Sequence, residues 1–364
     1  MVVGRSFWCI AEARLATICV AEDRIICEPA LKLLLLSLSK HCSNTVVNVF
    51  YPPADRKFQD WVKRFPQVTL HLEPFTDASH WNVKPYAMLF LLDQGFEEVI
   101  WLDSDVIVTR DICRVIGRLD NETLVITEEA LWGAHEDPGA IRARLSGLSV
   151  GRILPFALNT AVMRVTKFHY PILFRWRETL ESKSYRDSQL LHWTDRPPHQ
   201  VGDQDVMTAL LTSVDFSNIP LRILLRGRDI IQFFGLYGYT LYERILNLIG
   251  QRPAFIHSQG HKPWRTEYPP QNARVSLRKY AELLYIDLSP YTLSAISLRK
   301  EFDEDTSWMD AHFLASAMLR VGGFWCLPLV GLPIALIVDI VRLAKRFGLD
   351  RVAKVSASSV RDAT

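Results

Sequence analysis

Short apolar runs of strand length alternate with helical segments along most of the chain. The strand candidates are ATICVA (16–21), TVVNVFY (45–51), VIWL (99–102), TLVIT (123–127), FALNTAVMRV (156–165) and PAFIHS (253–258). Runs that are apolar nearly throughout are typical of strands buried on both faces of a sheet. Strands of this kind between helices predict an α/β fold, with a mainly parallel sheet that helices cover on both sides.

Two helices are indicated by the proline and glycine residues at their ends. Pro29 opens EPALKLLLLSLSKH (28–41), which is apolar nearly all round and is therefore expected to be a buried helix. Lys84 and Pro85 precede YAMLFLLDQG, in which Gly95 is suited to end the helix. Ligands of open α/β sheets bind beyond the carboxyl ends of the strands, so residues that follow strands are the first candidates for a site.

The segment VIWLDSDVIVTRDI (99–112) places two carboxylates inside an apolar run. In an extended chain residues i and i+2 point to the same side, so Asp103 and Asp105 are expected to converge while Ser104 faces away. Buried carboxylates repel each other, and a bound divalent cation removes that repulsion. Oxygen ligands favour Mg²⁺ or Mn²⁺, which also bind substrate phosphates. A polar turn with two solvated aspartates is the plainer alternative.

Other positions have chemical reasons of their own to belong to a site. Lys84 precedes a helix that begins with proline, and an ammonium beside free backbone N–H groups favours a phosphate; a solvated lysine is the alternative. His257 follows the apolar run AFI and is either a metal ligand or an ordinary core or loop histidine. Asp203 either belongs to the site or caps the helix that follows it. The aromatic segment 233–242 is expected to pack internally or to line an acceptor site, and His135 to be an ordinary loop residue.

Composition is that of a globular protein with one large core. Of the 364 residues, 49% are hydrophobic and 23% are charged, and a net charge of only +2 argues against a nucleic-acid partner. The six cysteines form no C-x-x-C pair, which favours a reducing, cytoplasmic compartment over a disulfide scaffold. Charged residues interrupt the N-terminal apolar stretch, so we expect it to belong to the folded domain rather than to a secretory signal.

Composition changes near residue 300, where the acidic stretch EFDEDTSWMD (301–310) begins. We therefore expect a main domain at 1–295, followed at 296–364 by a linker, an apolar membrane-associating segment and a basic tail. Residues 321–338 are uncharged and apolar, are barely long enough to span a bilayer, and have basic residues on both sides. An interfacial helix or re-entrant hairpin keeps both flanks on the cytoplasmic face, which predicts peripheral or monotopic membrane contact through 312–346. A helix packed on the core or in a dimer is the alternative.

The segment WLDSDVIVTRDI resembles the metal-binding Asp-x-Asp strand of GT-A glycosyltransferases, particularly the retaining family 8 type. Further segments are similar to that family's motifs in the same order. ATICVAED resembles the opening strand, and LNTAVMRV resembles the Asn-x-Gly strand with Ala161 in place of the glycine. GDQDVMTALL resembles the Asp-Gln helix start, and FIHSQGHKPW resembles the His-x-x-Gly-x-x-Lys-Pro-Trp segment with one residue fewer. The resemblance implies a GT-A, Rossmann-like α/β sheet with a C-terminal apolar helical appendage.

The resemblance also implies a role for each matching residue. Asp103, Asp105 and His257 would bind the metal ion, and one imidazole with two carboxylates suits Mn²⁺ somewhat better than Mg²⁺. The residues expected to contact the nucleotide-diphosphate sugar are Ala21, Glu22, Asp23, Lys84, Asp103, Ser104, Asn159, Gly260 and Lys262. The catalytic residues lining the reactive face of the sugar would be Asp203, Gln204 and Asp205. Neither Gln204 nor Asp205 is assigned as a nucleophile.

We therefore expect a metal-dependent glycosyltransferase that uses a nucleotide-diphosphate sugar, first of all a UDP-sugar. The acceptor would be a saccharide or a lipid-linked or cell-envelope molecule, and the configuration of the sugar would be retained. The cation, Lys84 and Lys262 would neutralise the diphosphate leaving group as the bond to the sugar breaks. Two alternatives remain: a metal-dependent nucleotidyltransferase or phosphohydrolase, and a membrane-bound sugar-nucleotide-binding protein with little turnover.

Overall fold

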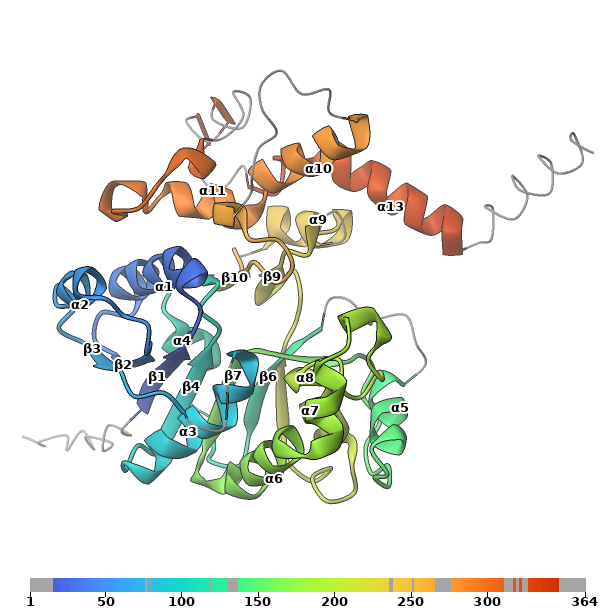
Figure 1. Cartoon of the computed structure of the whole chain (residues 1–364). Coiled ribbons are helices and arrows are strands. Elements are labelled where there is room, and N and C mark those ends of the chain that lie inside the picture. The colour runs from blue at the N-terminus through green and yellow to red at the C-terminus, as the bar shows by residue number, and fades with distance from the viewer. Residues whose placement is uncertain are drawn as a thin grey trace, which may run out of the picture.

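The computed structural model describes residues 16–75, 78, 80–117, 119–129, 137–235, 238–250, 252–265, 276–310, 317–318, 321–322 and 327–346. His135, the first 15 residues and parts of the segment 312–346 lie outside the described residues. Over the described part, the chain forms a large twisted sheet between helices and a separate small sheet, with further helices at the same end of the molecule as the small sheet (Figure 1).

The large sheet has seven strands in the order β3-β2-β1-β4-β7-β6-β8. These strands are β1 (Ala16–Ala21), β2 (Val46–Phe50), β3 (Val68–His71), β4 (Glu98–Leu102), β6 (Leu124–Glu128), β7 (Leu158–Thr166) and β8 (Leu221–Leu224). β7 runs antiparallel to its neighbours β4 and β6, and the other adjacent pairs run parallel. The predicted fold class, a mainly parallel α/β sheet, is confirmed.

Alternate residues of the central strands face two separate apolar cores. Ile18 and Val20 of β1 pack with α1 and α2 on one face, whereas Cys19 packs with α3, α6 and α8 on the other. The helices around the sheet are α1 (Glu28–His41), α2 (Arg56–Val62), α3 (Lys84–Asp93), α4 (Ile112–Ile116), α5 (Pro138–Leu145), α6 (Tyr170–Glu181), α7 (Lys183–Gln189) and α8 (Asp203–Thr212). Burial on both faces explains why these strands are apolar nearly throughout.

The two helices predicted from their terminal residues are α1 and α3. α3 carries Lys84 and Pro85 in its first turn. It is followed by Gly95 at a φ of +99°, a backbone conformation that glycine adopts without strain.

The small sheet has the strand order β5-β10-β9, with β5 (Val106–Val108), β9 (Ile230–Gln232) and β10 (Phe255–His257). β10 pairs antiparallel with β5 and parallel with β9. The strand predicted at 253–258 therefore lies outside the large sheet. Both edges of β4 are occupied by β1 and β7, so the chain that leaves β4 pairs with a new partner instead of widening the sheet.

The C-terminal part contains α9 (Leu241–Ile249), α10 (Leu277–Asp287), α11 (Pro290–Ile296) and α13 (Leu332–Arg346). The acidic stretch after α11 folds back on α1, where buried Lys32 pairs with Glu304 at 2.5 Å and with Asp303 at 3.2 Å. Trp308 joins the apolar core that contains α1. The domain boundary at residue 295 stays a prediction. Over the described residues, no helix combines the length and apolar content that crossing a bilayer needs.

Candidate functional site

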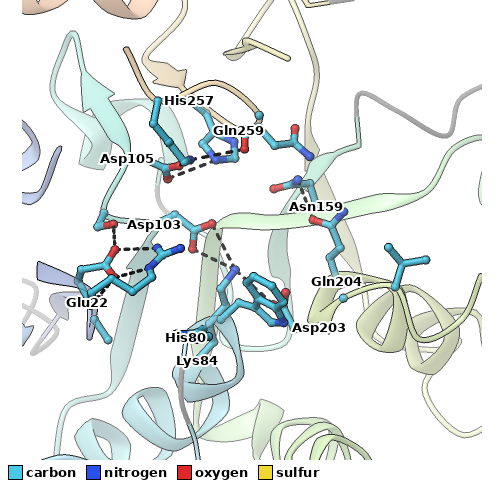
Figure 2. A pocket seen from close by; sticks show the side chains of 18 of the residues that line it. Glu22, His80, Lys84, Asp103, Asp105, Asn159, Asp203, Gln204, His257 and Gln259 are labelled. Carbon is cyan, nitrogen blue, oxygen red and sulfur yellow. Dashed lines mark hydrogen bonds and ion pairs between the residues drawn. The ribbon is translucent and has the colours of Figure 1, made fainter. Parts of the chain in front are cut away.

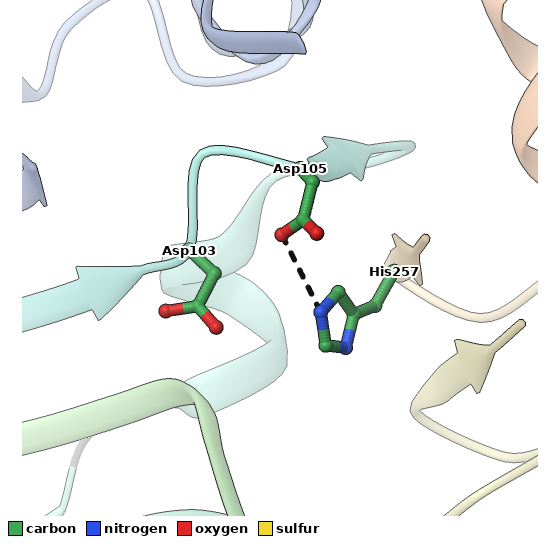
Figure 3. Close-up of side chains that lie close together, drawn as sticks. All are labelled: Asp103, Asp105 and His257. Atoms are coloured by element: carbon green, nitrogen blue, oxygen red, sulfur yellow. Dashed lines mark ion pairs between the residues drawn. The ribbon is translucent and has the colours of Figure 1, made fainter. Parts of the chain in front are cut away.

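Asp103 and Asp105 lie in a tight turn between β4 and β5, where the Val106 N–H donates to the Asp103 carbonyl at 3.2 Å. The prediction that the two aspartates share one side of an extended strand is therefore wrong, because the chain turns here from the large sheet into the small one. The turn nevertheless gathers the predicted ligands. His257 ends β10 directly opposite Val106. Ligand atoms of Asp103, Asp105 and His257 all lie within 4.8 Å of one another (Figure 3).

Asp105 is buried beside two basic groups. Its carboxylate is 3.4 Å from His257 Nε2 and accepts a hydrogen bond from Lys262 Nζ, which also donates to the Ser258 carbonyl at 2.6 Å. Burial works to raise the pKa of Asp105, but Lys262 and His257 outweigh it and hold that pKa well below its usual range. Asp105 is therefore an ionised carboxylate, the form that binds a metal ion.

Lys84 holds two carboxylates on the opposite wall. Its Nζ is 3.0 Å from Asp103 and 3.2 Å from Asp203, and it donates to the Thr160 hydroxyl at 2.9 Å. Burial works against the charged form of Lys84, but Asp103 and Asp203 outweigh it and raise its pKa. Because these three acceptors use all three protons of the ammonium group, the structure places Lys84 as a support for Asp103 and Asp203.

These groups line one cavity of about 460 Å³, a size that suits a small-molecule ligand. The structure brings together twelve predicted site residues there: Ala21, Glu22, Lys84, Asp103, Ser104, Asp105, Asn159, Asp203, Gln204, His257, Gly260 and Lys262 (Figure 2). Two predicted residues, Asp23 and Asp205, do not line the cavity. A Cβ atom on Gly260 would be 2.7 Å from the Phe234 ring, which explains the glycine at this position.

Asp205 has a structural position instead of the predicted catalytic one. It is 1% exposed, pairs with Arg142 Nε at 2.7 Å, and accepts from the Gly202 N–H at 3.0 Å. Gly202 is the N-cap residue of α8, so Asp205, and not Asp203, supplies the side-chain acceptor at this helix start. Burial raises the pKa of Asp205 to about 6 although Arg142 acts to lower it.

Two residues after β1 that were predicted to contact the nucleoside, Glu22 and Asp23, are hydrogen-bonded to other side chains of the protein. Glu22 accepts from Arg24 Nε at 2.7 Å and from the Ser104 hydroxyl at 2.6 Å, which joins the end of β1 to the Asp103–Asp105 turn. Asp23 accepts from the His80 backbone N–H at 2.7 Å and lies 3.1 Å from its Nδ1. The Asp23 side chain therefore contacts the cavity wall through His80, and the Asp23 N–H donates to the cavity residue Glu22 at 3.1 Å.

A buried carboxylate that the sequence analysis missed connects three amide side chains of the cavity. Glu129 accepts from Asn159 Nδ2 at 2.8 Å, from Gln204 Nε2 at 2.6 Å and from Gln259 Nε2 at 3.0 Å. Gln259 lies inside FIHSQGHKPW, between the predicted site residues His257 and Gly260, so its position in the sequence indicated that it belongs to the site. Glu129 follows β6 without such a signal.

The other cavity residues missed from the sequence are mainly aromatic or basic: Arg24, His80, Trp81, Trp101, Trp193, Arg196, Val201, Gly202 and Phe234. Trp101 precedes the two aspartates, and its Nε1 donates to Asp103 at 2.8 Å. Phe234 falls in the aromatic segment that was considered for an acceptor site. Trp193 begins a short 3-10 helix (Trp193–Asp195) and Arg196 follows it, and nothing in this stretch of the sequence indicated that it lies at the cavity.

No protein-family model and none of the curated proteins matches this sequence. Solved structures with a similar fold include the bifunctional glycosyltransferase WbbM, with 14% identity and a TM-score of 0.46 over 81% of this chain. The galactosyltransferase LgtC, solved with donor and acceptor sugar analogs, has 13% identity and a TM-score of 0.47 over 80% of this chain. GlyE of Streptococcus pneumoniae has 15% identity and a TM-score of 0.45 over 80% of this chain.

This chain spans about half of the WbbM chain (52%), 66% of the GlyE chain and 98% of the LgtC chain. Each of these proteins is a glycosyltransferase, the class that the sequence motifs resemble. The similarity concerns the fold, so the function has to follow from the chemistry of the site.

Proposed function

We propose that the protein is a GT-A glycosyltransferase that depends on a divalent metal ion. The observation that carries this proposal is the group Asp103, Asp105 and His257 on the wall of the cavity, with ligand atoms within 4.8 Å of one another. Two carboxylates and one imidazole fit Mn²⁺ or Mg²⁺, which keep open positions for phosphate oxygens. When bound, such an ion would supply positive charge to a diphosphate leaving group.

The donor that fits is a nucleotide-diphosphate sugar, and we place a UDP-sugar first. Lys262 reaches Asp105 from the edge of the cavity and is the cationic side chain best placed to turn toward a diphosphate. Lys84 keeps Asp103 and Asp203 in position beneath it. Charge that is fixed before the reaction stabilises a leaving group without further reorganisation.

The sugar would lie against Asn159, Gln204 and Gln259, whose amides converge on Glu129. Gln204 and Asp203 would orient the sugar and stabilise the charge that develops on it as the bond breaks. The acceptor would be a saccharide or a lipid-linked cell-envelope molecule, and the transfer would retain the configuration of the sugar. We further place the protein on the cytoplasmic face of a membrane, with 1–295 as the catalytic domain and contact through 312–346.

A panel of UDP-, GDP- and dTDP-sugars tests the proposal by thermal stabilisation and by release of the nucleoside diphosphate. Each is measured with Mn²⁺, with Mg²⁺ and with EDTA. We expect one donor to stabilise the protein only when the metal is present, and to be turned over under the same conditions. Stabilisation that is equally strong in EDTA would contradict the metal-dependent part. Metal-dependent binding without turnover on any acceptor would favour the binding-protein alternative.

A further inference from the structure

Helix α9 is inverted relative to an ordinary surface helix. Its buried residues are the polar Glu243, Arg244 and Asn247. Its exposed face is apolar, with Tyr242 68% and Ile249 80% exposed and with Ile245 and Leu248 also exposed. A surface helix of a soluble domain normally turns its apolar face to the core, so this orientation needs a reason.

The buried face of α9 is polar because it binds the surrounding backbone. Arg244 donates to the Pro328 and Val330 carbonyls at 3.0 and 2.5 Å, and so holds the turn that precedes α13. Glu243 pairs with Arg226 at 2.7 Å and accepts from the Thr240 N–H at 2.8 Å. Asn247 is hydrogen-bonded to Tyr239 and Gly227. These bonds fix the rotation of α9 and force its apolar face outward.

α13 continues this apolar surface. It contacts α9, and its Asp339 accepts from the Leu241 N–H at 2.8 Å at the start of α9. Both helices lie at the end of the molecule opposite α6 (Figure 1). The exposed large hydrophobic residues of α9 and α13, here called the α9–α13 surface, are Tyr242, Ile245, Leu248, Ile249, Leu336, Ile337, Ile340, Val341 and Leu343. A patch of large apolar side chains at two adjoining helices marks an interaction site.

We propose that the α9–α13 surface lies on an anionic lipid bilayer. Up to Val341 the sequence of α13 is apolar apart from Asp339, which is bound to the start of α9, and it then places Arg342, Lys345 and Arg346 in the last turns. This pattern matches acyl chains beside anionic headgroups. The described part of α13 has 15 residues, fewer than a span of the hydrocarbon layer needs, and this length suits a helix in the interface plane.

This assignment extends the membrane contact proposed for 312–346 into α9, a helix of the main domain. The cavity residue Phe234 is separated from the first residue of α9 by only six residues, so the proposed membrane contact is close in sequence to the cavity wall.

Vesicle co-sedimentation of the full chain tests this proposal, with phosphatidylcholine vesicles compared with vesicles that also contain phosphatidylglycerol. The test variants are Ile245→Gln with Ile249→Gln on α9, and Ile337→Gln with Ile340→Gln on α13. The matched control is Ile153→Gln with Leu190→Gln, at positions that are 77% and 85% exposed and outside the surface. We expect binding to anionic vesicles that weakens with salt, a loss of about tenfold or more in each test variant, and no loss in the control.

Three results would overturn the proposal. The wild-type chain fails to bind anionic vesicles, the α9 variant binds as well as the wild type, or light scattering shows a dimer that the α9 variant converts to a monomer. The last result would assign the surface to a second copy of the chain. Because the substituted residues are exposed, equal melting temperatures of all variants check that each one is folded.

A second inference concerns Glu129, which is 1% exposed and lies behind the cavity wall. A carboxylate only accepts hydrogen bonds, so it fixes the three amide nitrogens of Asn159, Gln204 and Gln259 toward itself. All three amides belong to residues that line the cavity. We infer that Glu129 is a positioning residue that holds the side chains of Asn159, Gln204 and Gln259 in the orientation that binds the hydroxyl groups of the donor sugar, an inference that rests on the proposed function.

The variant Glu129→Gln tests it, because glutamine has the same shape but adds an NH₂ group that opposes the three amides. We expect the affinity for the UDP-hexose that the wild type uses to fall about tenfold, while UDP binds with Mn²⁺ as in the wild type. Glu128→Gln is the control, since Glu128 accepts from the Arg226 N–H outside the cavity. Equal losses for UDP and UDP-hexose, or no loss, would overturn the positioning role. A wild-type chain that binds neither would refute the proposed function itself.

Discussion

Lys84 is the group whose removal the structure makes most informative. Lys84→Met keeps the volume of the side chain and deletes the ammonium that lies 3.0 Å from Asp103 and 3.2 Å from Asp203. Lys84 is 4% exposed and Asp203 5%, so water cannot replace the lost charge. Breaking a buried ion pair by removal of one partner lowers the free energy of unfolding by about 3–5 kcal/mol. For a chain of 364 residues this corresponds to a fall of about 4–7 °C in the melting temperature.

The loss of stability in Lys84→Met should depend on pH. Burial and Asp103 already act to raise the pKa of Asp203, and without Lys84 that pKa rises further. The folded variant then holds a proton that the unfolded chain releases at a lower pH. Its stability therefore falls as the pH rises above the ordinary range of a carboxyl group, and it is nearly normal at low pH. The full loss is expected at pH 8 and a much smaller one at pH 5.

Thermal unfolding in EDTA at pH 5 and pH 8 measures both effects. Lys57→Met is the matched control, because the Lys57 side chain is 63% exposed and its pair with Glu304 contributes little. An equal loss at both pH values, or no loss at pH 8, would refute the account of Lys84 as the counter-charge of two buried carboxylates.

The remaining predictions concern the two faces of α8 and the loop after β10. Asp203→Asn should lower turnover about 10- to 100-fold, because Asp203 lies in the cavity and supports Asp103 through Lys84. Its effect on stability should be smaller than that of Lys84→Met, because Asp103 still neutralises Lys84. Asp205→Asn should keep most of the turnover, because Asp205 does not line the cavity and its side chain pairs with the buried Arg142. Comparison of kcat for the two variants checks this, and a larger loss in Asp205→Asn would reverse the assignment. Gly260→Ala places a Cβ atom 2.7 Å from the Phe234 ring. We expect it to lower the free energy of unfolding by about 1–3 kcal/mol and to raise the KM for the donor. An unchanged melting temperature and an unchanged KM would show that this contact does not exist.

Five strands of the large sheet (β1, β2, β4, β6 and β7) and the helices α1 and α3 could be predicted because their signals are local, whereas β3 and β8 were not predicted. β1 and α1 have the predicted limits, since the apolar runs end at polar residues and Pro29 marks the start of α1. The helix that begins at Lys84 was predicted from its proline and from Gly95 for the same reason. In these segments, propensity, patterning and tertiary burial all favour the same structure.

The errors arose where tertiary contacts decide. Whether Asp103 and Asp105 continue a strand or form a turn depends on the occupied edges of β4, which a local pattern does not contain. Glu129 meets its partners across 30 to 130 positions of sequence, and no motif marks it. Asp205 was assigned with its neighbours Asp203 and Gln204, but the helix turns it toward Arg142 and away from the cavity.

The central claim is that Asp103, Asp105 and His257 hold one divalent cation at the cavity. Titration of the full chain with Mn²⁺, followed by electron paramagnetic resonance, tests it without any assumption about the substrate. We predict one site per chain, weakened about 100-fold or more in Asp105→Asn and in His257→Ala, and unchanged in the surface variant Asp60→Asn. Wild-type affinity in Asp105→Asn and His257→Ala, or no Mn²⁺ binding by the wild-type chain with or without UDP, would contradict the account.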